Sequence, residues 1–252
     1  LIMDNTAAPL LCRPLAHGAA ALVYSATKYL GGHGTSIGGL IVDGGNFDWA
    51  AAGDRQPALN SPDPSYHGAV WTQAVQALGP VAYIMRARTV LLRDLGAAMS
   101  PFNAFQLLQG VETLPLRMPR HCENAVKVAD WLAQRAQVTR VIHPSQQTGE
   151  VRARADRYLA GGLGGLVGFE LAGGVEAGRK FIDGLQLLYH VANIGDARSL
   201  AIHPASTTHS QLDAQAQLAT GVSPGYVRLS IGLEHIDDII ADLDQALTAA
   251  GA

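Results

Sequence analysis

The chain has 252 residues, of which 48% are hydrophobic and 15% are charged, and its formal net charge is −3 at pH 7. The sequence has no basic cluster of the kind that nucleic-acid binding requires, and no apolar run reaches the roughly 18–20 residues that span a bilayer. The composition therefore argues against nucleic acid and membrane as partners, and we expect a cytoplasmic protein. The charged fraction, below the roughly 25% typical of soluble domains, is compatible with large buried contacts between subunits.

Short apolar segments in the first third of the chain predict three strands, at Leu1 to Asp4, Leu22 to Tyr24 and Leu40 to Val42. Glycine-rich connections separate them, and the last two strands bracket the segment SATKYLGGHGTSIGG at residues 25–39. Residues 45–68 are polar and rich in turn formers, so we expect an exposed excursion there.

Prolines predict the starts of three helices in the middle of the chain. Pro80, Pro101 and Pro119 each suit the first turn of a helix, where the missing N–H group costs nothing. We expect the third of these helices to lead into a smaller C-terminal domain, with the boundary near residue 112. The C-terminal part is predicted to be α+β, with strands at Val138 to Ile142, Leu166 to Leu171 and Tyr226 to Ile231, a helix from about Glu176, and a final amphipathic helix from Ile236.

Lys28 lies between a strand-like segment and a glycine-rich turn, with Ser25 and Thr27 beside it, and Asp4 ends an apolar segment upstream. Pyridoxal phosphate (PLP) chemistry needs a lysine that forms a Schiff base, an anion that keeps the pyridine nitrogen protonated, and donors that hold the phosphate. These four residues supply one of each. Taken singly, each has an ordinary structural explanation as a solvated charge, a cap or a loop hydroxyl.

Several motifs follow one another along the chain: DNT (4–6), CRP (12–14), SATKYLGGHGTSIGG (25–39), LRMPRHCENA (116–125), HPASTTHSQL (203–212) and VRLSIGLEHIDDIIADL (227–243). Together they resemble the Cys/Met-metabolism family of fold-type I PLP-dependent enzymes over nearly the whole chain. Within this family, GGHGTSIGG (31–39) and PSYHG (64–68) look most like the O-acetylhomoserine sulfhydrylase branch.

The resemblance implies an α/β fold, the C-terminal part of an aspartate-aminotransferase-like transferase with a mixed, mostly parallel sheet, helices and a smaller α+β C-terminal domain. Residues 1–112 would be the C-terminal part of the PLP-binding large domain, and residues 113–252 the C-terminal small domain. Family members carry an N-terminal portion ahead of the DNT strand, which we expect this chain to lack together with the cofactor contacts it supplies. They assemble as homotetramers, dimers of dimers, so we expect a homo-oligomer.

The resemblance also implies roles for individual residues. Lys28 would be the catalytic residue that forms the Schiff base with pyridoxal 5'-phosphate, and Asp4, Ser25 and Thr27 would bind the cofactor with it. No metal is expected. Cys12 and Cys122 lie in different segments without a partner at metal-ligand spacing, so we interpret both as reduced, packed thiols rather than as a disulfide or zinc site.

Arg228 and Asn193 are the predicted substrate-binding residues. Arg228 lies inside an apolar run, where a guanidinium is costly to bury without an anion. The resemblance implies a bidentate contact with the substrate α-carboxylate, and an internal salt bridge is the structural alternative. Asn193 aligns with a position near that carboxylate where other branches carry serine. His33 and His203 lie in motif segments, and we weigh a functional role for each, as a residue type that can change charge near neutral pH, against a role as a hydrogen-bonded structural histidine.

The activity implied by the resemblance is γ-replacement on O-acetylhomoserine with sulfide or a thiol, a transfer of an aminocarboxypropyl group that gives homocysteine or methionine. A cystathionine γ-synthase, a cystathionine γ-lyase and a methionine γ-lyase remain alternatives on the same scaffold, because fold does not determine function. A non-catalytic cofactor-binding fragment is the alternative from another class.

Overall fold

The computed structural model describes residues 1–251, which divide into two compact units. Unit 1 consists of Leu1–Thr6, Arg13–Ala26 and Ile37–Phe105. Unit 2 consists of Ala7–Cys12, Thr27–Ser36 and the described chain from Gln106 onward. The segment that carries Lys28 therefore belongs to unit 2. The expected domain boundary near residue 112 stays a prediction.

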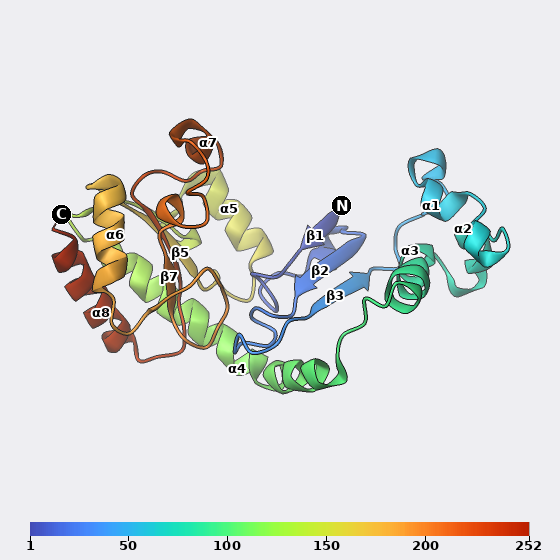
Figure 1. Cartoon of the computed structure of the whole chain (residues 1–252), viewed down its shortest axis with the longest axis horizontal. Helices are drawn as coiled ribbons and strands as arrows, with labels where there is room; N and C mark the ends of the chain where they lie inside the picture. Colours follow the sequence, from blue (N-terminus) through green and yellow to red (C-terminus); the bar gives the residue numbers. More distant parts are fainter. Residues whose placement is uncertain (252) are drawn as a thin grey trace. The chain divides into compact units, whose positions relative to one another are not determined.

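Unit 1 contains a three-stranded sheet in the order β1 (Ile2–Asp4), β2 (Ala21–Ser25) and β3 (Gly39–Asp43), as Figure 1 shows. β1 pairs with β2 in parallel, and β2 pairs with β3 antiparallel. The three strands expected from the apolar segments are confirmed to within one residue at each end. Because β1 and β2 are parallel, Asp4 and Ser25 lie at the C-terminal ends of neighbouring strands, on the same side of the sheet's ends.

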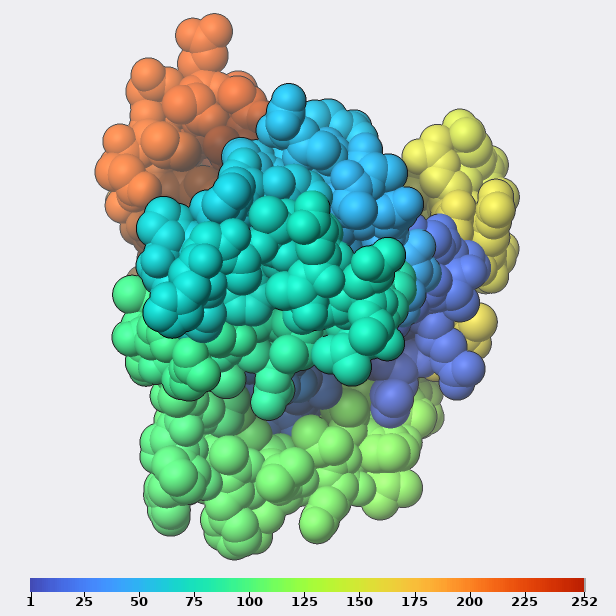
Figure 2. All heavy atoms as spheres, turned by 90° about the vertical axis from the view of Figure 1, so that its right-hand side faces the viewer, coloured from blue at the N-terminus to red at the C-terminus, as the bar shows by residue number. Residues whose placement is uncertain are grey.

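The rest of unit 1 folds around an aromatic cluster, in which the side chains of Trp49, Leu59 and Trp71 are buried. The Trp49 and Tyr83 rings stack with their centroids 5.1 Å apart. The expected exposed excursion at residues 45–68 therefore buries part of its own side chains; its atoms face the viewer in Figure 2. The helices of this region are η2 (Gly53–Arg55), α1 (Pro57–Asn60), η3 (Pro64–Tyr66), α2 (Trp71–Ala74), η4 (Gln76–Leu78), α3 (Ala82–Arg86) and the π-helix η5 (Ala87–Asp94).

Helix α4 (Pro101–Leu132) is a single helix of 32 residues, with Pro115 and Pro119 in its interior. The prediction that Pro119 starts a separate helix is therefore wrong. A proline inside a helix removes one backbone hydrogen bond and strains the preceding turn, but a stripe of buried side chains at Leu114, Met118 and Ala125 continues past both prolines. Burial of this stripe outweighs the local cost. Neither α4 nor any other helix within residues 1–251 is long and apolar enough to cross a membrane.

Unit 2 contains a five-stranded sheet in which β4, β5, β8 and β7 are antiparallel neighbours and β6 pairs in parallel with β7. The expected α/β architecture with mixed sheets is confirmed, but a parallel majority is not found among the described strands. Parallel neighbours need a crossover connection, usually a helix. Residues 26–38 join β2 to β3 without a helix, and these two strands are antiparallel. The strands are β4 (Val138–Ile142), β5 (Leu166–Leu171), β6 (Tyr189–His190), β7 (Leu200–Ile202) and β8 (Tyr226–Ser230). The remaining helices of unit 2 are η6 (Pro144–Gln146), α5 (Gly149–Tyr158), α6 (Gly174–Gly184), η7 (Pro204–Ser206), α7 (Ala214–Ala219) and α8 (Ile236–Ala250), whereas η1 (Pro14–His17) belongs to unit 1.

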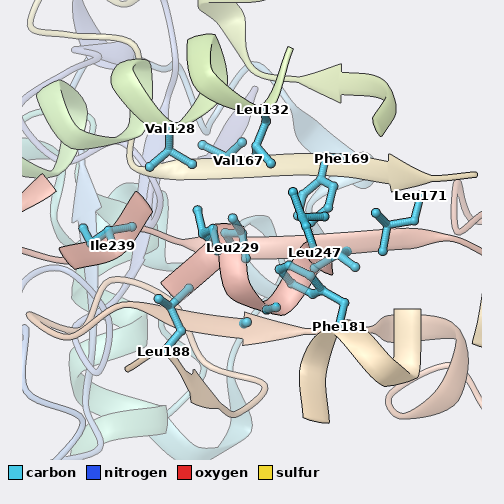
Figure 3. Packing of buried hydrophobic residues seen from close by; sticks show 14 of the residues in the cluster. Val128, Leu132, Val167, Phe169, Leu171, Phe181, Leu188, Leu229, Ile239 and Leu247 are labelled. Carbon is cyan, nitrogen blue, oxygen red and sulfur yellow. The ribbon is translucent and has the colours of Figure 1, made fainter. Parts of the chain in front are cut away.

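One face of this sheet packs against α4, α6 and α8 and forms the main hydrophobic core of unit 2 (Figure 3). The Phe169 and Phe181 rings meet edge to face with centroids 5.3 Å apart, and both side chains are fully buried. In β8, Val227 and Leu229 are also fully buried. Since side chains alternate between the faces of a strand, Arg228 and Ser230 belong to the opposite face, where the candidate site lies.

Candidate active site

Lys28 begins a tight helical turn that follows β2. The backbone N–H of Gly32 donates a hydrogen bond of 2.7 Å to the Lys28 carbonyl, which closes this turn. The half-buried Lys28 side chain donates from Nζ to Oδ1 of Asn193 at 2.5 Å. Asn193 lies in the connection between β6 and β7, so the fold of unit 2 brings together two predicted site residues that are 165 positions apart.

Arg228, in the middle of β8, contacts the same asparagine. Its Nη2 atom donates to the backbone carbonyl of Asn193 at 3.3 Å. None of the ion pairs among the described residues involves Arg228, so the internal salt bridge considered above is not present in this part of the chain. A guanidinium has five N–H donors, which leaves Arg228 able to bind an external anion beside Lys28 and Asn193.

Gly195 and Ser230 hold the loop that carries Asn193. The Gly195 N–H donates to Oγ of Ser230 at 2.9 Å. Gly195 has φ of +72°, and a Cβ atom there would lie 2.6 Å from the backbone nitrogen of Tyr29, so only glycine fits. These supporting residues were not predicted. Ser230 lies two positions after Arg228 in the same strand, so both side chains are on one face of the sheet, and this spacing is the sequence signal that could have identified Ser230.

Tyr29 and His121 pack behind the lysine. Tyr29 is fully buried, and its ring meets that of His121 edge to face with centroids 5.2 Å apart. Burial raises the pKa of the Tyr29 hydroxyl. Burial also lowers the pKa of His121, whose Nδ1 lies 2.6 Å from the Ile231 carbonyl. Both side chains are therefore neutral near pH 7, and they support the turn by packing.

Asp4 and Ser25 are the predicted cofactor-binding residues of unit 1. The Thr6 hydroxyl and then the Thr6 backbone N–H, which donates to Oδ1 of Asp4 at 2.9 Å, hold the pKa of the Asp4 carboxyl below its usual value. The Thr6 hydroxyl also accepts a 2.8 Å hydrogen bond from the Ser25 N–H. Thr6 thus joins the ends of β1 and β2, a role that the sequence did not reveal.

The remaining candidates are explained by local structure. His203 is buried, with Nδ1 2.8 Å from Oγ of Ser206 and Nε2 2.8 Å from the Pro224 carbonyl, and burial lowers its pKa. It is a hydrogen-bonded structural histidine. His33 is exposed, with Nδ1 2.7 Å from the Gly31 carbonyl, and Thr27 is half-buried beside Lys28. Within residues 1–251, no three His, Cys, Asp or Glu side chains gather as metal ligands.

Comparisons with known proteins show which family the chain resembles in sequence. The sequence model of the family described as Cys/Met metabolism PLP-dependent enzyme matches residues 1–248. The O-acetyl-L-homoserine sulfhydrylase of Leptospira meyeri is 54% identical over an alignment of 254 positions, and the match covers 98% of this chain and 57% of that protein. O-acetyl-L-homoserine sulfhydrylase 1 of Thermus thermophilus is 50% identical over 249 residues, 98% of this chain and 58% of that protein.

A solved structure, that of the metY protein of Campylobacter jejuni, is similar with a TM-score of 0.89 and 40% sequence identity, and the match covers 98% of this chain and 58% of that one. The Campylobacter protein carries an N'-pyridoxyl-lysine-5'-monophosphate residue. The chain therefore spans a little more than half the length of the relatives it matches.

Proposed function

The chain belongs to the Cys/Met metabolism family of PLP-dependent enzymes, and from this premise we propose that the protein replaces the γ-acetoxy group of O-acetylhomoserine by sulfide or a small thiol. The relatives named O-acetyl-L-homoserine sulfhydrylase support this substrate class. The observation that carries the proposal is the convergence of Lys28 and Arg228 on Asn193. The Lys28 amine contacts its side chain, and the Arg228 guanidinium, which has no carboxylate partner in the described chain, contacts its backbone carbonyl.

The residues present suit PLP in their chemistry. Lys28 offers a half-buried primary amine that contacts a neutral amide. Asp4 offers a carboxylate, as a partner for a protonated pyridine nitrogen must, and Thr6 lowers its pKa further. Ser25 and Thr27 flank Lys28 in sequence and supply hydroxyl groups for a phosphate. This donor set matches the three requirements of the cofactor: an amine, an anion and phosphate donors.

When bound, PLP would withdraw electrons from the substrate Cα and so acidify its proton. Lys28 would bind the aldehyde carbon of the cofactor and, once its amine is released, would accept the Cα proton at Nζ as a general base. Asn193 would orient Nζ, and Arg228 would bind the substrate α-carboxylate through paired N–H donors. In the net reaction the C–O bond at Cγ breaks with loss of acetate and a C–S bond forms, so sulfide gives homocysteine and methanethiol gives methionine.

Two substitutions test these roles. Lys28→Ala should abolish both the visible absorbance band of the bound cofactor and γ-replacement activity. Arg228→Ala should keep the band but raise KM for O-acetylhomoserine by about 10- to 100-fold, since hydrogen bonds to charged groups contribute roughly 1.5–3 kcal/mol. A Lys28→Ala protein that keeps the band and the activity would refute the proposal, and an unchanged KM in Arg228→Ala would refute the carboxylate role.

Competing reactions on the same scaffold are distinguished by the nucleophile. Homocysteine formation from O-acetylhomoserine and sulfide supports the sulfhydrylase, whereas cystathionine formation with cysteine as the nucleophile supports a cystathionine γ-synthase. Substituting O-succinylhomoserine identifies the acyl group. Release of a 2-oxo acid from methionine or cystathionine supports a γ-lyase.

The candidate from another class is a non-catalytic part that binds the cofactor. A chain that takes up PLP and shows no turnover with any of these substrates would support it. The homotetramer, the cytoplasmic location and the cofactor contacts of an N-terminal portion stay predictions; sedimentation of the purified protein tests the first.

A further inference from the structure

Arg117 is a buried cation in α4 without a carboxylate partner. Only 6% of the residue is exposed. None of the ion pairs among residues 1–251 includes it. A charge in this position is costly unless several hydrogen bonds replace its hydration, so its acceptors indicate why it is there.

The acceptors of Arg117 come from two places, the turn that follows Lys28 and its own helix. Nη1 donates to the carbonyl of Tyr29 at 2.9 Å, and Nη2 donates to the carbonyl of Leu30 at 3.2 Å. Nη2 also donates to the Gly110 carbonyl at 2.8 Å, and Nε donates to Oγ1 of Thr113 at 3.1 Å. The guanidinium therefore bridges the two residues after Lys28 to α4. Carbonyls at the end of a helical turn lack partners within the turn, and Arg117 supplies them.

Two glycines allow the turn and the helix to approach this closely. A Cβ atom on Gly110 would lie 2.2 Å from the Gly31 carbonyl oxygen, and one on Gly32 would lie 2.4 Å from Nη1 of Arg117. The backbone of the turn therefore packs directly against the backbone of α4, and the Arg117 guanidinium stabilises this contact by hydrogen bonds to both.

We propose that Arg117 is a positioning residue for Lys28, an inference that rests on the proposed function of that lysine. The Lys28 side chain has four rotatable bonds, so the place of Nζ depends on the turn that carries it and on its contact with Asn193. Arg117 fixes the turn through the next two carbonyls. Lysine cannot replace it, because an ammonium group is a point charge and lacks the planar fork that contacts four acceptors.

The test compares Arg117→Met and Arg117→Lys with Arg120→Met. Arg120 lies on the same helix but is partly exposed and pairs only with Glu123, 3.9 Å away, so it is a matched control. The first readout is hydrogen–deuterium exchange of the backbone at residues 27–36, measured without added PLP and therefore independent of activity. Both Arg117 variants should exchange at least about 10-fold faster there, since the contacts that suppress local opening are lost, and Arg120→Met should match the wild type.

The second readout is steady-state kinetics of the PLP-loaded protein. Misplacement of a reacting group by about 1 Å costs on the order of 100-fold, so Arg117→Met should lower kcat by about 10- to 100-fold with KM nearly unchanged. Guanidinium ion at low concentration should restore part of the loss in Arg117→Met and none in Arg120→Met. Wild-type exchange at residues 27–36 in a folded Arg117→Met protein overturns the proposal, and so does a fall in kcat without faster exchange.

Thr113→Val keeps the proposal testable if the Arg117 variants do not fold. It removes one hydroxyl, which accepts from Nε of Arg117 and donates to the Gly110 carbonyl at 3.2 Å, and it leaves the contacts of Arg117 with the turn in place. Exchange at residues 27–36 should rise in the same direction by a smaller factor; unchanged exchange overturns the proposal. A wild-type protein without a PLP absorbance band would refute the proposed function instead, while the exchange measurement still reports on Arg117.

Discussion

At the scale of single residues, one neighbour lowers the pKa of Asp4. The hydroxyl and backbone N–H of Thr6 both lower the pKa of Asp4, and the same hydroxyl accepts the Ser25 N–H. Because the carboxyl has a lower pKa in the folded than in the unfolded chain, its contribution to stability is present above the unfolded pKa and is lost as the pH falls through the folded value. Because Asp4 is exposed, we expect the lowered pKa to affect mainly the charge of this carboxyl and to affect stability little.

Thr6→Val tests this dependence. Valine keeps the branched shape but removes the hydroxyl, so the pKa of Asp4 should rise towards its ordinary value of 3.8 while the backbone hydrogen bond remains. Thr6→Ser keeps the hydroxyl and should leave the pKa unchanged. NMR titration of the Asp4 carboxyl carbon measures both. Equal pKa values in the valine and serine variants would show that the hydroxyl has no such role.

The proposed reactive residues were easier to find in the sequence than the residues proposed to position them. Lys28 and Arg228 lie in the motifs at residues 25–39 and 227–243, and in the structure both contact Asn193. Arg117 and Arg120 stand three positions apart in one motif and look equivalent in the sequence. Only Arg117 falls on the helical stripe of buried residues, and two of its four acceptors belong to a turn 87 and 88 positions away, which no local pattern encodes.

At the scale of elements, the long strands and the amphipathic helices were predictable, and the short or strained ones were not. β4 and β5 have the predicted bounds, and α8 begins at the predicted Ile236. β6 and β7 have two and three residues, and they exist because β8 supplies a partner for β7 and β7 one for β6. Helix α4 continues through Pro119 because the burial of its stripe outweighs a local signal to stop.

Helix α4 also reverses a general expectation for glycine. Replacing an interior helical glycine by alanine ordinarily stabilises a helix by about 0.8–1 kcal/mol. At Gly110 the new Cβ would meet the Gly31 carbonyl oxygen at 2.2 Å. Gly110→Ala should therefore lower the free energy of unfolding, by about 1–3 kcal/mol, as overpacking does.

Urea unfolding of Gly110→Ala measures this loss, with Gln109→Ala as the control. Gln109 is exposed on the adjacent position of α4, so its substitution should change the free energy of unfolding by less than about 0.5 kcal/mol. A Gly110→Ala protein more stable than the wild type would mean that the turn at Gly31 moves away at no cost, and the close packing described here would then be unimportant for stability.

At the scale of the whole chain, three histidines are buried in their neutral form, and their burial makes the stability of the protein depend on pH. His121, His143 and His203 are at most 2% exposed, and burial lowers the pKa of each. In the unfolded chain they would titrate near 6.5. Below that pH the unfolded state binds protons that the folded state does not, so stability falls as the pH decreases.

The free energy of unfolding should therefore decrease between pH 7 and pH 5, a window above the range in which ordinary carboxyl groups titrate. Each histidine contributes at most about 1.4 kcal/mol per pH unit, so the slope approaches about 4 kcal/mol per pH unit if all three remain neutral. Urea unfolding at three pH values measures this slope. His203→Gln should reduce it by the share of one histidine, because glutamine does not titrate. A slope near zero in the wild type would mean that the three imidazoles accept protons inside the folded protein, against the desolvation that their burial imposes.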